Sequence, residues 1–245
     1  MGAKLAVSWG GGVDSTAILV EFARRGIRPD FITFADTGAE KPETYEYIWL
    51  FSQWLIDHGM PAPTIVYHSK KWRNLEESCT GNATLPSLAF GGHSCSLKYK
   101  RAPMDKWFNR NPVARAEWAA GRKVVKAIGF EAGETKRTFR VSKNVDPKYD
   151  YVYPLQEWGW DRQRCMDEIF RAGLPVPMKS SCFFCPAMKK HEVDWLVEHH
   201  PELAARAVEM ERKAMPKMTS SKGLGRNWNW GEYLAAKAPR LREAA

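Results

Sequence analysis

The chain has 245 residues, of which 44% are hydrophobic, and a formal net charge of +9. This apolar content excludes wholesale disorder, and no apolar run reaches the roughly 18 residues that a membrane span needs. The N-terminus has no charged segment followed by an apolar stretch and a cleavage site. We therefore expect a cytoplasmic protein without a membrane partner, built as one large domain or a domain with an appendage.

Strands and helices are expected to alternate in the first half of the chain. Apolar runs of β character occur at residues 4–8, 30–36, 64–68 and 123–130, and helical patterns at residues 16–25 and 43–59. This alternation predicts an α/β fold, an open and mainly parallel sheet flanked by helices. The long segment 69–94 contains glycine and serine, and a gap of this length is usually functional or mobile. A helix is expected to start within 96–108, with Pro103 marking a break or a start.

The second half reads as mainly helical. Residues 161–173 predict a helix with Asp161 as its N-cap, and residues 191–200 and 201–214 predict two helices separated at Pro201. From Met218 onward the chain is expected to be irregular. We predict a nucleotide-binding α/β domain at 1–175 and, packed on it, a C-terminal helical extension with a Cys-x-x-Cys motif at 176–245.

A glycine-rich turn follows the first predicted strand. Gly10, Gly11 and Gly12 precede Asp14 and Ser15, where a helix is expected to begin. Glycines let backbone N–H groups approach an anion closely, and a helix N-terminus adds further donors and a favourable dipole. The turn predicts a phosphate site, although it has neither the Lys-Ser/Thr pair of a P-loop nor the third glycine of a dinucleotide fingerprint. A tight turn without a ligand is the alternative.

Residues 10–15 resemble the pyrophosphate loop, Ser-Gly-Gly-x-Asp-Ser, of the ATP pyrophosphatase (PP-loop) superfamily. Gly10 replaces the first serine of that motif, and Ser8 could supply the missing hydroxyl. The resemblance implies that ATP and Mg²⁺ bind here, with Asp14 and Ser15 acting in catalysis.

Three further motifs resemble the phosphoadenosine phosphosulfate (PAPS) reductase family. They are the Asp-Thr-Gly-x-x-x-Pro-Glu-Thr type segment within 34–47, the segment 128–137, and the Pro-Leu-x-x-Trp type stretch from Pro154. The four motifs occur in the order expected for that family, over about residues 5–195. The resemblance implies an adenine nucleotide alpha hydrolase-like fold that binds the nucleotide through Asp36, Thr37, Gly129 and Glu134, with Lys98 and Arg137 as further catalytic residues.

Five cysteines occur, and an odd number in a reducing compartment argues against a disulfide framework. Cys182-x-x-Cys185 could be a redox pair, part of a zinc site or part of an iron–sulfur site. Cys165, in the middle of a predicted helix, is expected to be a small buried hydrophobic residue.

Cys95 lies in a segment that resembles the Cys-x-x-x-Lys region of iron–sulfur members of the PAPS reductase family. Those members carry adjacent cysteines, whereas this chain has Ser94 before Cys95, so a fourth ligand must come from elsewhere, and Cys79 is the natural candidate. The resemblance implies a 4Fe–4S cluster held by Cys79, Cys95, Cys182 and Cys185. A zinc ion at the same four residues is one alternative, and free thiols without a metal are another. Lys98 and Arg101 would offset its negative charge, and His93 could replace one cysteine.

Basic and aromatic residues suggest polyanionic partners. Forked guanidinium groups after the fourth strand suit phosphate recognition, and the tail interleaves basic residues with tryptophans that could stack on bases. The alternatives are a solvated basic loop and tryptophans that dock on their own domain. The residues concerned are Lys136, Arg137 and Arg140 in the loop, and Lys222, Arg226, Trp228 and Trp230 in the tail.

The resemblance favours an enzyme that cleaves ATP between its α- and β-phosphates and couples adenylylation to sulfur transfer. The acceptor would be a nucleic acid or a nucleotide, and a partner protein is a possible sulfur donor. One alternative is a PAPS or adenosine phosphosulfate reductase that produces sulfite, but its C-terminal Glu-Cys-Gly-x-His motif is missing and no cysteine follows Cys185. Another is a nucleic-acid-binding module with a structural zinc. The sequence identifies neither the acceptor, the sulfur donor nor the oligomeric state.

Overall fold

The computed structural model describes residues 2–68, 74–86, 94–142, 145–218, 222–225 and 227–243, with the side chains of 140–142 and 238–243 left out. The chain forms two compact units. Unit 1 comprises residues 1–35, 42–66 and 104–180, and unit 2 comprises residues 36–41, 67–103 and 181–245. The predicted boundary at residue 175 lies near the last passage of the chain into unit 2. Two earlier segments, residues 36–41 and 67–103, also belong to that unit, which the sequence analysis did not predict.

An open sheet dominates unit 1, and its five strands within the described residues have the order β3-β2-β1-β4-β5. β1 pairs in parallel with β2 and β4, and β4 pairs in parallel with β5. The predicted α/β class is therefore confirmed. The strands are β1 (Leu5–Ser8), β2 (Phe31–Asp36), β3 (Thr64–Tyr67), β4 (Val124–Ala127) and β5 (Tyr149–Val152).

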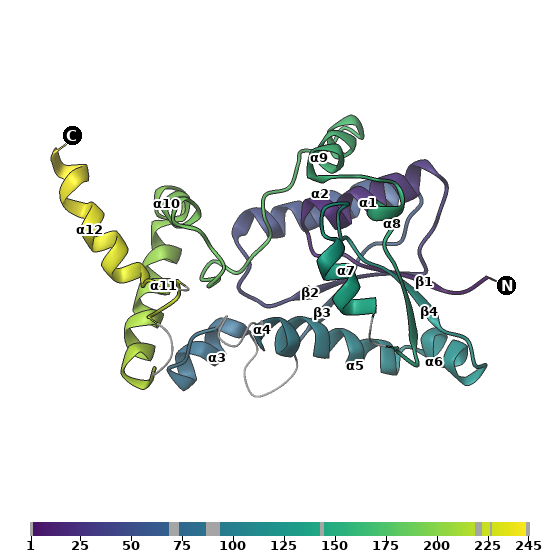
Figure 1. Ribbon diagram of the computed structural model, residues 1–245, viewed down its shortest axis with the longest axis horizontal. Coiled ribbons are helices and arrows are strands. Elements are labelled where there is room, and N and C mark those ends of the chain that lie inside the picture. The colour runs from purple at the N-terminus through teal and green to yellow at the C-terminus, as the bar shows by residue number, and fades with distance from the viewer. Residues whose placement is uncertain are drawn as a thin grey trace. The chain divides into compact units, whose positions relative to one another are not determined.

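Helices cover both faces of the sheet because successive side chains of a strand point to opposite faces (Figure 1). Val7 and Ile32 join one core with α1, α2 and α9, whereas Ala6 and Phe31 join another with α5 and α6. The helices named so far, together with the two others that follow β4 and β5, are α1 (Val13–Arg24), α2 (Pro42–Asp57), α5 (Ala102–Arg110), α6 (Pro112–Ala119), α7 (Thr135–Ser142), α8 (Pro154–Glu157) and α9 (Arg162–Arg171).

Unit 2 is helical and packs around its own hydrophobic core, to which Tyr99, Phe184, Leu196 and Trp230 contribute. The buried carboxylate of Glu211 accepts hydrogen bonds from the backbone N–H groups of residues 224, 230 and 231, at 2.6, 3.0 and 2.8 Å, and so fixes the C-terminal segment on this core. The elements of unit 2 are α3 (Leu75–Asn82), α4 (Ser94–Ser96), the π-helical η2 (Leu97–Arg101), α10 (Lys190–His199), α11 (Pro201–Ala214), the 3₁₀ turn η3 (Met215–Lys217) and α12 (Trp230–Glu243).

Several predicted elements are confirmed with small changes at their ends. Asp161 is the N-cap of α9, and its carboxylate accepts the N–H of Arg164 at 2.8 Å. Pro201 begins α11, as expected for a residue that tolerates the first helical position. Within the described ranges, no helix is long and apolar enough to cross a membrane.

Other expectations were wrong, each for a physical reason. α12 occupies the tail expected to be irregular, because Trp230, Tyr233 and Leu234 have helical spacing and pack on the core of unit 2. Helix α3 interrupts the predicted gap at 69–94. The expectation for Pro103 is, by contrast, confirmed: α5 begins at Ala102, directly after the π-helical η2, and a proline is tolerated in the first turn of a helix.

Candidate functional site

The glycine turn lies between β1 and α1, as predicted. Gly11 has φ +69°, a conformation that favours glycine. A Cβ at this position would also lie 3.4 Å from the Phe34 ring and 3.5 Å from the Thr44 methyl group. These are ordinary contact distances, so it is the backbone conformation that favours glycine here.

Hydrogen bonds from within the turn and from α1 hold it in shape. The buried indole of Trp9 donates to Thr16 Oγ1 at 2.9 Å, and this hydroxyl donates to the carbonyl of Gly12 at 2.8 Å. The N–H of Gly10 donates to Ser15 Oγ at 3.1 Å. Gly12 is the N-cap of α1, and no side chain in the described part of the chain caps this helix. An anion at the turn would meet backbone donors in a fixed arrangement.

The end of β4 presses against the same turn. A Cβ on Gly129 would lie 2.9 Å from the backbone nitrogen of Ser15 and 3.2 Å from the carbonyl carbon of Asp14. β1 and β4 are neighbours in the sheet, but their connections leave in opposite directions along the strand order, which makes this the topological switch point. Ligands of open α/β sheets bind outside the carboxyl ends of the strands at such a point.

Asp14 is the charged residue of the turn, and Arg162, at the start of α9, holds it. The guanidinium donates to both carboxylate oxygens, at 2.9 and 3.1 Å. Burial nevertheless raises the pKa of Asp14, and the opposing effect of Arg162 does not cancel the rise. Glu134 and Arg137 also influence this pKa, so they lie near Asp14.

Glu134 and Arg137 are partners of each other in α7 and the turn before it. Arg137 donates to the Glu134 carboxylate at 2.9 Å, and its guanidinium lies 4.3 Å from the centre of the Phe130 ring. The structure thus brings the predicted turn residues together with Gly129, Glu134 and Arg137. Arg162 was missed, because its sequence context indicated the start of a helix but not that this helix begins beside the glycine turn.

Two other predicted nucleotide-binding residues, Asp36 at the end of β2 and Thr37 just after it, belong to unit 2. The Asp36 carboxylate accepts the N–H of Gly38 at 2.7 Å. Thr37 is buried, and its hydroxyl lies 3.1 Å from Glu40 Oε1 and 3.2 Å from Cys182 Sγ. Thr37 therefore contacts one of the predicted metal ligands. Ser8 is the last residue of β1 and pairs in register with Thr33.

The four predicted metal ligands lie in unit 2 and share its core. The thiols of Cys79 and Cys182 are buried in this core, and Cys95 and Cys185 pack against it. The N–H of Cys185 donates to the carbonyl of Cys182 at 3.0 Å, which closes the turn of the Cys-x-x-Cys motif. Cys165 instead lies fully buried in the core of unit 1, as predicted for a hydrophobic residue.

An ion pair that the sequence did not indicate accompanies these thiols. Lys100 Nζ lies 3.1 Å from Glu40 Oε1, and Cys182 Sγ lies 4.0 Å from the same oxygen. Burial opposes the charged form of Lys100, but Glu40 and the nearby thiols outweigh burial and raise its pKa. Burial raises the pKa of Cys79, and the positive charge of the predicted Lys98 opposes this rise without cancelling it. We call the four cysteines with Thr37, Glu40 and Lys100 the cysteine centre.

The donor set of the cysteine centre suits a thiolate-bound group. Burial raises the pKa of Cys79 to about 12 and raises that of Cys182 further, so both thiols are protonated at neutral pH. Such thiols release protons when a metal or cluster binds. Four thiols in one core have the number and type that a 4Fe–4S cluster or zinc requires. Among the described side chains, no three His, Cys, Asp or Glu residues are arranged to hold a metal ion.

The basic and aromatic residues of the tail are arranged differently from a strand-binding patch. Trp230 is fully buried and Trp228 packs beside it in the core of unit 2, so these tryptophans dock on their own unit. Lys136 and Lys222 are exposed. His93, Arg226 and the side chain of Arg140 lie outside the described residues.

The fold and the site together define an α/β protein with a glycine turn at the switch point of its open parallel sheet. No family model and no curated protein matches the chain. Among solved structures, it is similar to the U34-tRNA thiolase NcsA from Methanococcus maripaludis with its [4Fe-4S] cluster. The sequence identity is 14%, the match covers 87% of this chain and 73% of that chain, and the TM-score is 0.48. Because the sequence identity and the TM-score are both low, this likeness does not indicate a shared activity.

Proposed function

We propose that the chain is an ATP-cleaving enzyme of the PP-loop type, similar to the PAPS reductase family, that adenylylates an acceptor in order to transfer sulfur to it. The observation that carries this proposal is the glycine turn at the switch point, where a helix N-terminus without a side-chain cap meets the end of β4. Fixed backbone donors at this place suit the β- and γ-phosphates of ATP, the group that leaves as pyrophosphate.

The charged residues beside the turn have distinct roles in this proposal. The carboxylate of Asp14 would hold Mg²⁺ beside the phosphates, since Mg²⁺ is usually bound through one or two carboxylates and the substrate phosphates. The hydroxyl of Ser15 would donate a hydrogen bond to the leaving pyrophosphate, and the guanidinium of Arg137 would offset the negative charge that develops on it. Catalysis of this kind depends on positioning and charge stabilisation rather than on a protein nucleophile.

The proposed reaction has two steps. An oxygen of the acceptor attacks the α-phosphorus of ATP, a new P–O bond forms, and the bond to the β-phosphate oxygen breaks with release of pyrophosphate. A hydrosulfide, delivered by a donor protein, then attacks the activated carbon; a C–S bond forms, the C–O bond breaks, and AMP leaves with the acceptor oxygen. The acceptor is proposed to be a nucleic acid or a nucleotide, in keeping with the basic charge of the chain.

The cysteine centre is proposed to hold a 4Fe–4S cluster through Cys79, Cys95, Cys182 and Cys185, and zinc is the alternative. When bound, a cluster supplies Lewis-acidic iron. Lys100 would offset the negative charge of the thiolates. Purification without oxygen, followed by iron, sulfide and zinc analysis, tests this assignment. Cys79→Ala should lower the metal content, whereas Cys165→Ala, in the other core, should leave it unchanged.

Incubation with ATP and assay of pyrophosphate and AMP test the proposed activity. Asp14→Asn and Ser15→Ala should abolish turnover, whereas Asp167→Asn, which removes the same charge from α9 of the same unit, should not. Unchanged turnover in both turn variants would exclude the glycine turn from the mechanism. Sulfite release from PAPS in the presence of thioredoxin would favour a reductase. A zinc protein that releases no pyrophosphate would favour a nucleic-acid-binding module.

A further inference from the structure

A cavity of about 280 Å³ lies in unit 1 at the C-terminal end of α1, between α1, α2 and α9. It is separate from the glycine turn, which lies at the opposite end of α1, roughly 16 Å away at 1.5 Å per helical residue. Val20 and Ala23 form part of an apolar wall, and Arg24 and Arg171 lie at its edge. We call this cavity and the arginines around it the arginine groove.

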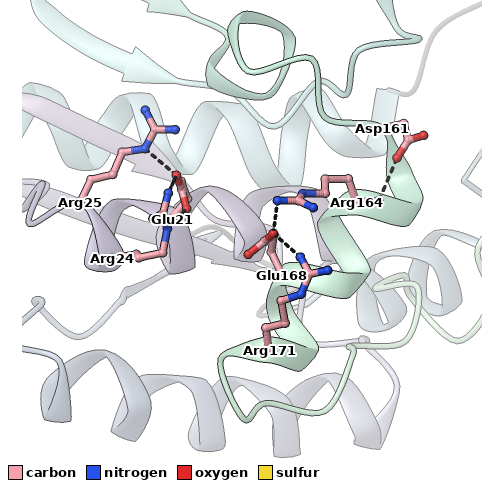
Figure 2. A network of polar contacts seen from close by, with 7 residues as sticks. All are labelled: Glu21, Arg24, Arg25, Asp161, Arg164, Glu168 and Arg171. Atoms are coloured by element: carbon pink, nitrogen blue, oxygen red, sulfur yellow. Dashed lines mark hydrogen bonds and ion pairs between the residues drawn. The ribbon is translucent and has the colours of Figure 1, made fainter.

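Two carboxylates hold four guanidinium groups at the groove (Figure 2). Glu21 of α1 accepts hydrogen bonds from Arg24 at 2.6 Å and Arg25 at 2.5 Å. Figure 2 shows the same arrangement on α9, where Glu168 Oε1 pairs with Arg164 and Arg171, each at 2.6 Å. One glutamate on each helix, buried Glu21 or half-buried Glu168, thus fixes two arginine side chains.

The burial of the acids contrasts with the exposure of the arginines. The side chain of Glu21 is 1% exposed and that of Glu168 is 12% exposed, whereas Arg24 and Arg171 are 66% and 57% exposed. With Asp161, which Figure 2 draws in the same network, four positive charges face three negative charges, so this cluster carries +1. Guanidinium groups held in place lose little freedom on binding an anion, and their remaining N–H groups suit the oxygens of a phosphate.

The cavity beside these arginines also has an aromatic wall. Trp54 of α2 and His58, in the turn just after α2, both line it, and their rings stack with centroids 3.8 Å apart and an angle of 21° between their planes. The indole N–H of Trp54 donates to the carbonyl of Ala172 at 3.3 Å, which connects this wall to the end of α9. The volume of the cavity lies just below the usual range for drug-sized ligands and suits a single planar ring system.

We propose that the arginine groove binds a single-stranded nucleic acid, with backbone phosphates on Arg24 and Arg171 and one base in the cavity against the Trp54–His58 wall. Arginine clusters beside aromatic rings are the combination that single-strand binding uses, because the cations follow the backbone and the rings stack on bases of any sequence. An acidic peptide could pair with the arginines but offers no regular planar group for the cavity. The proposal does not depend on ATP cleavage, because binding at this site requires no nucleotide.

Fluorescence anisotropy with labelled 20-nucleotide uridine RNA and the matching thymidine DNA, without ATP, tests the proposal. The test variant is Arg24→Gln/Arg171→Gln. Its matched control is Arg212→Gln, because Arg212 is also an exposed arginine paired with a glutamate three residues earlier on a helix, Glu209. The double variant should bind about 10-fold more weakly. Its plot of log K against log salt should lose about 1.4 in slope, or 0.7 for each phosphate contact, while the control keeps wild-type binding.

Two further measurements keep the test decisive. If the double variant does not fold, ultraviolet crosslinking of the wild-type protein to the RNA should label peptides from α2 or α9. Crosslinks confined to other elements would overturn the proposal, as would equal weakening in the Arg212→Gln control or equally effective competition by polyglutamate. Basal pyrophosphate release should be unchanged in Arg24→Gln/Arg171→Gln, so failure of the groove and failure of the ATP chemistry give different results.

Discussion

Replacing Gly129 by alanine tests whether the end of β4 positions the glycine turn. The new Cβ would lie 2.9 Å from Ser15 N, and the neighbouring atoms belong to the backbone, so no flexible side chain can move aside. Restoring an ordinary 3.4 Å contact requires a shift of about 0.5 Å, close to the tolerance within which functional groups must be held. Overpacking of this kind typically costs about 1–3 kcal/mol of stability.

We expect Gly129→Ala to reduce kcat/KM for pyrophosphate release by about 10-fold, since a displacement of 1 Å can cost about 100-fold. Stability is measured by urea unfolding and turnover by pyrophosphate release. Gly121→Ala is the control: Gly121 has φ +73°, so alanine is strained there, but its Cβ would meet no atom within 4 Å. This control should lose stability and keep its turnover. Equal turnover in wild type and Gly129→Ala, or equal loss in both variants, would refute the reasoning.

Two other substitutions have distinct expected outcomes. Glu211→Gln should lower the free energy of unfolding by about 2–3 kcal/mol and make α12 accessible to proteases. The buried carboxylate accepts three backbone N–H groups, and hydrogen bonds to charged groups contribute about 1.5–3 kcal/mol each. Glu202→Gln, at an exposed position, should change neither the stability nor the proteolysis of α12. Asp14→Asn should raise the melting temperature at pH 7 while it abolishes turnover. Burial raises the pKa of Asp14 in the folded state, so ionisation of this carboxyl disfavours folding. The gain should vanish below about pH 4, where the wild-type carboxyl is protonated in both states, and a gain that persists there would contradict the sign of the shift.

The sequence predicted the parts of the fold whose signal is local. The glycine turn, the strand before it and the N-cap at Asp161 depend on neighbouring residues, and the structure places them where the pattern indicated. β5 was missed, because the partly buried pattern of its four residues has no strong alternation. Helix α12 was missed because glycine and serine precede it, and its start depends on the distant carboxylate of Glu211.

The candidate site was predictable to the same extent. The motif resemblance predicted that one site contains Asp14, Ser15, Gly129, Glu134 and Arg137, and in the structure these residues lie near one another in unit 1. Arg162, Glu40 and Lys100 were not predicted, because their importance comes from contacts with residues far away in the sequence. Lys100 lies two positions after the predicted Lys98, and the two lysines point to different sides of the same helical turn.

The division of the chain between the two units has a consequence for biosynthesis. Unit 2 takes residues 36–41 and 67–103 from the first half of the chain, but most of its core comes from residues 181–245. During translation, the ribosome releases the segments with Cys79 and Cys95 long before the helices that cover them, whereas unit 1 is complete once residue 180 has emerged. Cys79 and Cys95 therefore stay without most of their core until residues 181–245 have been synthesised.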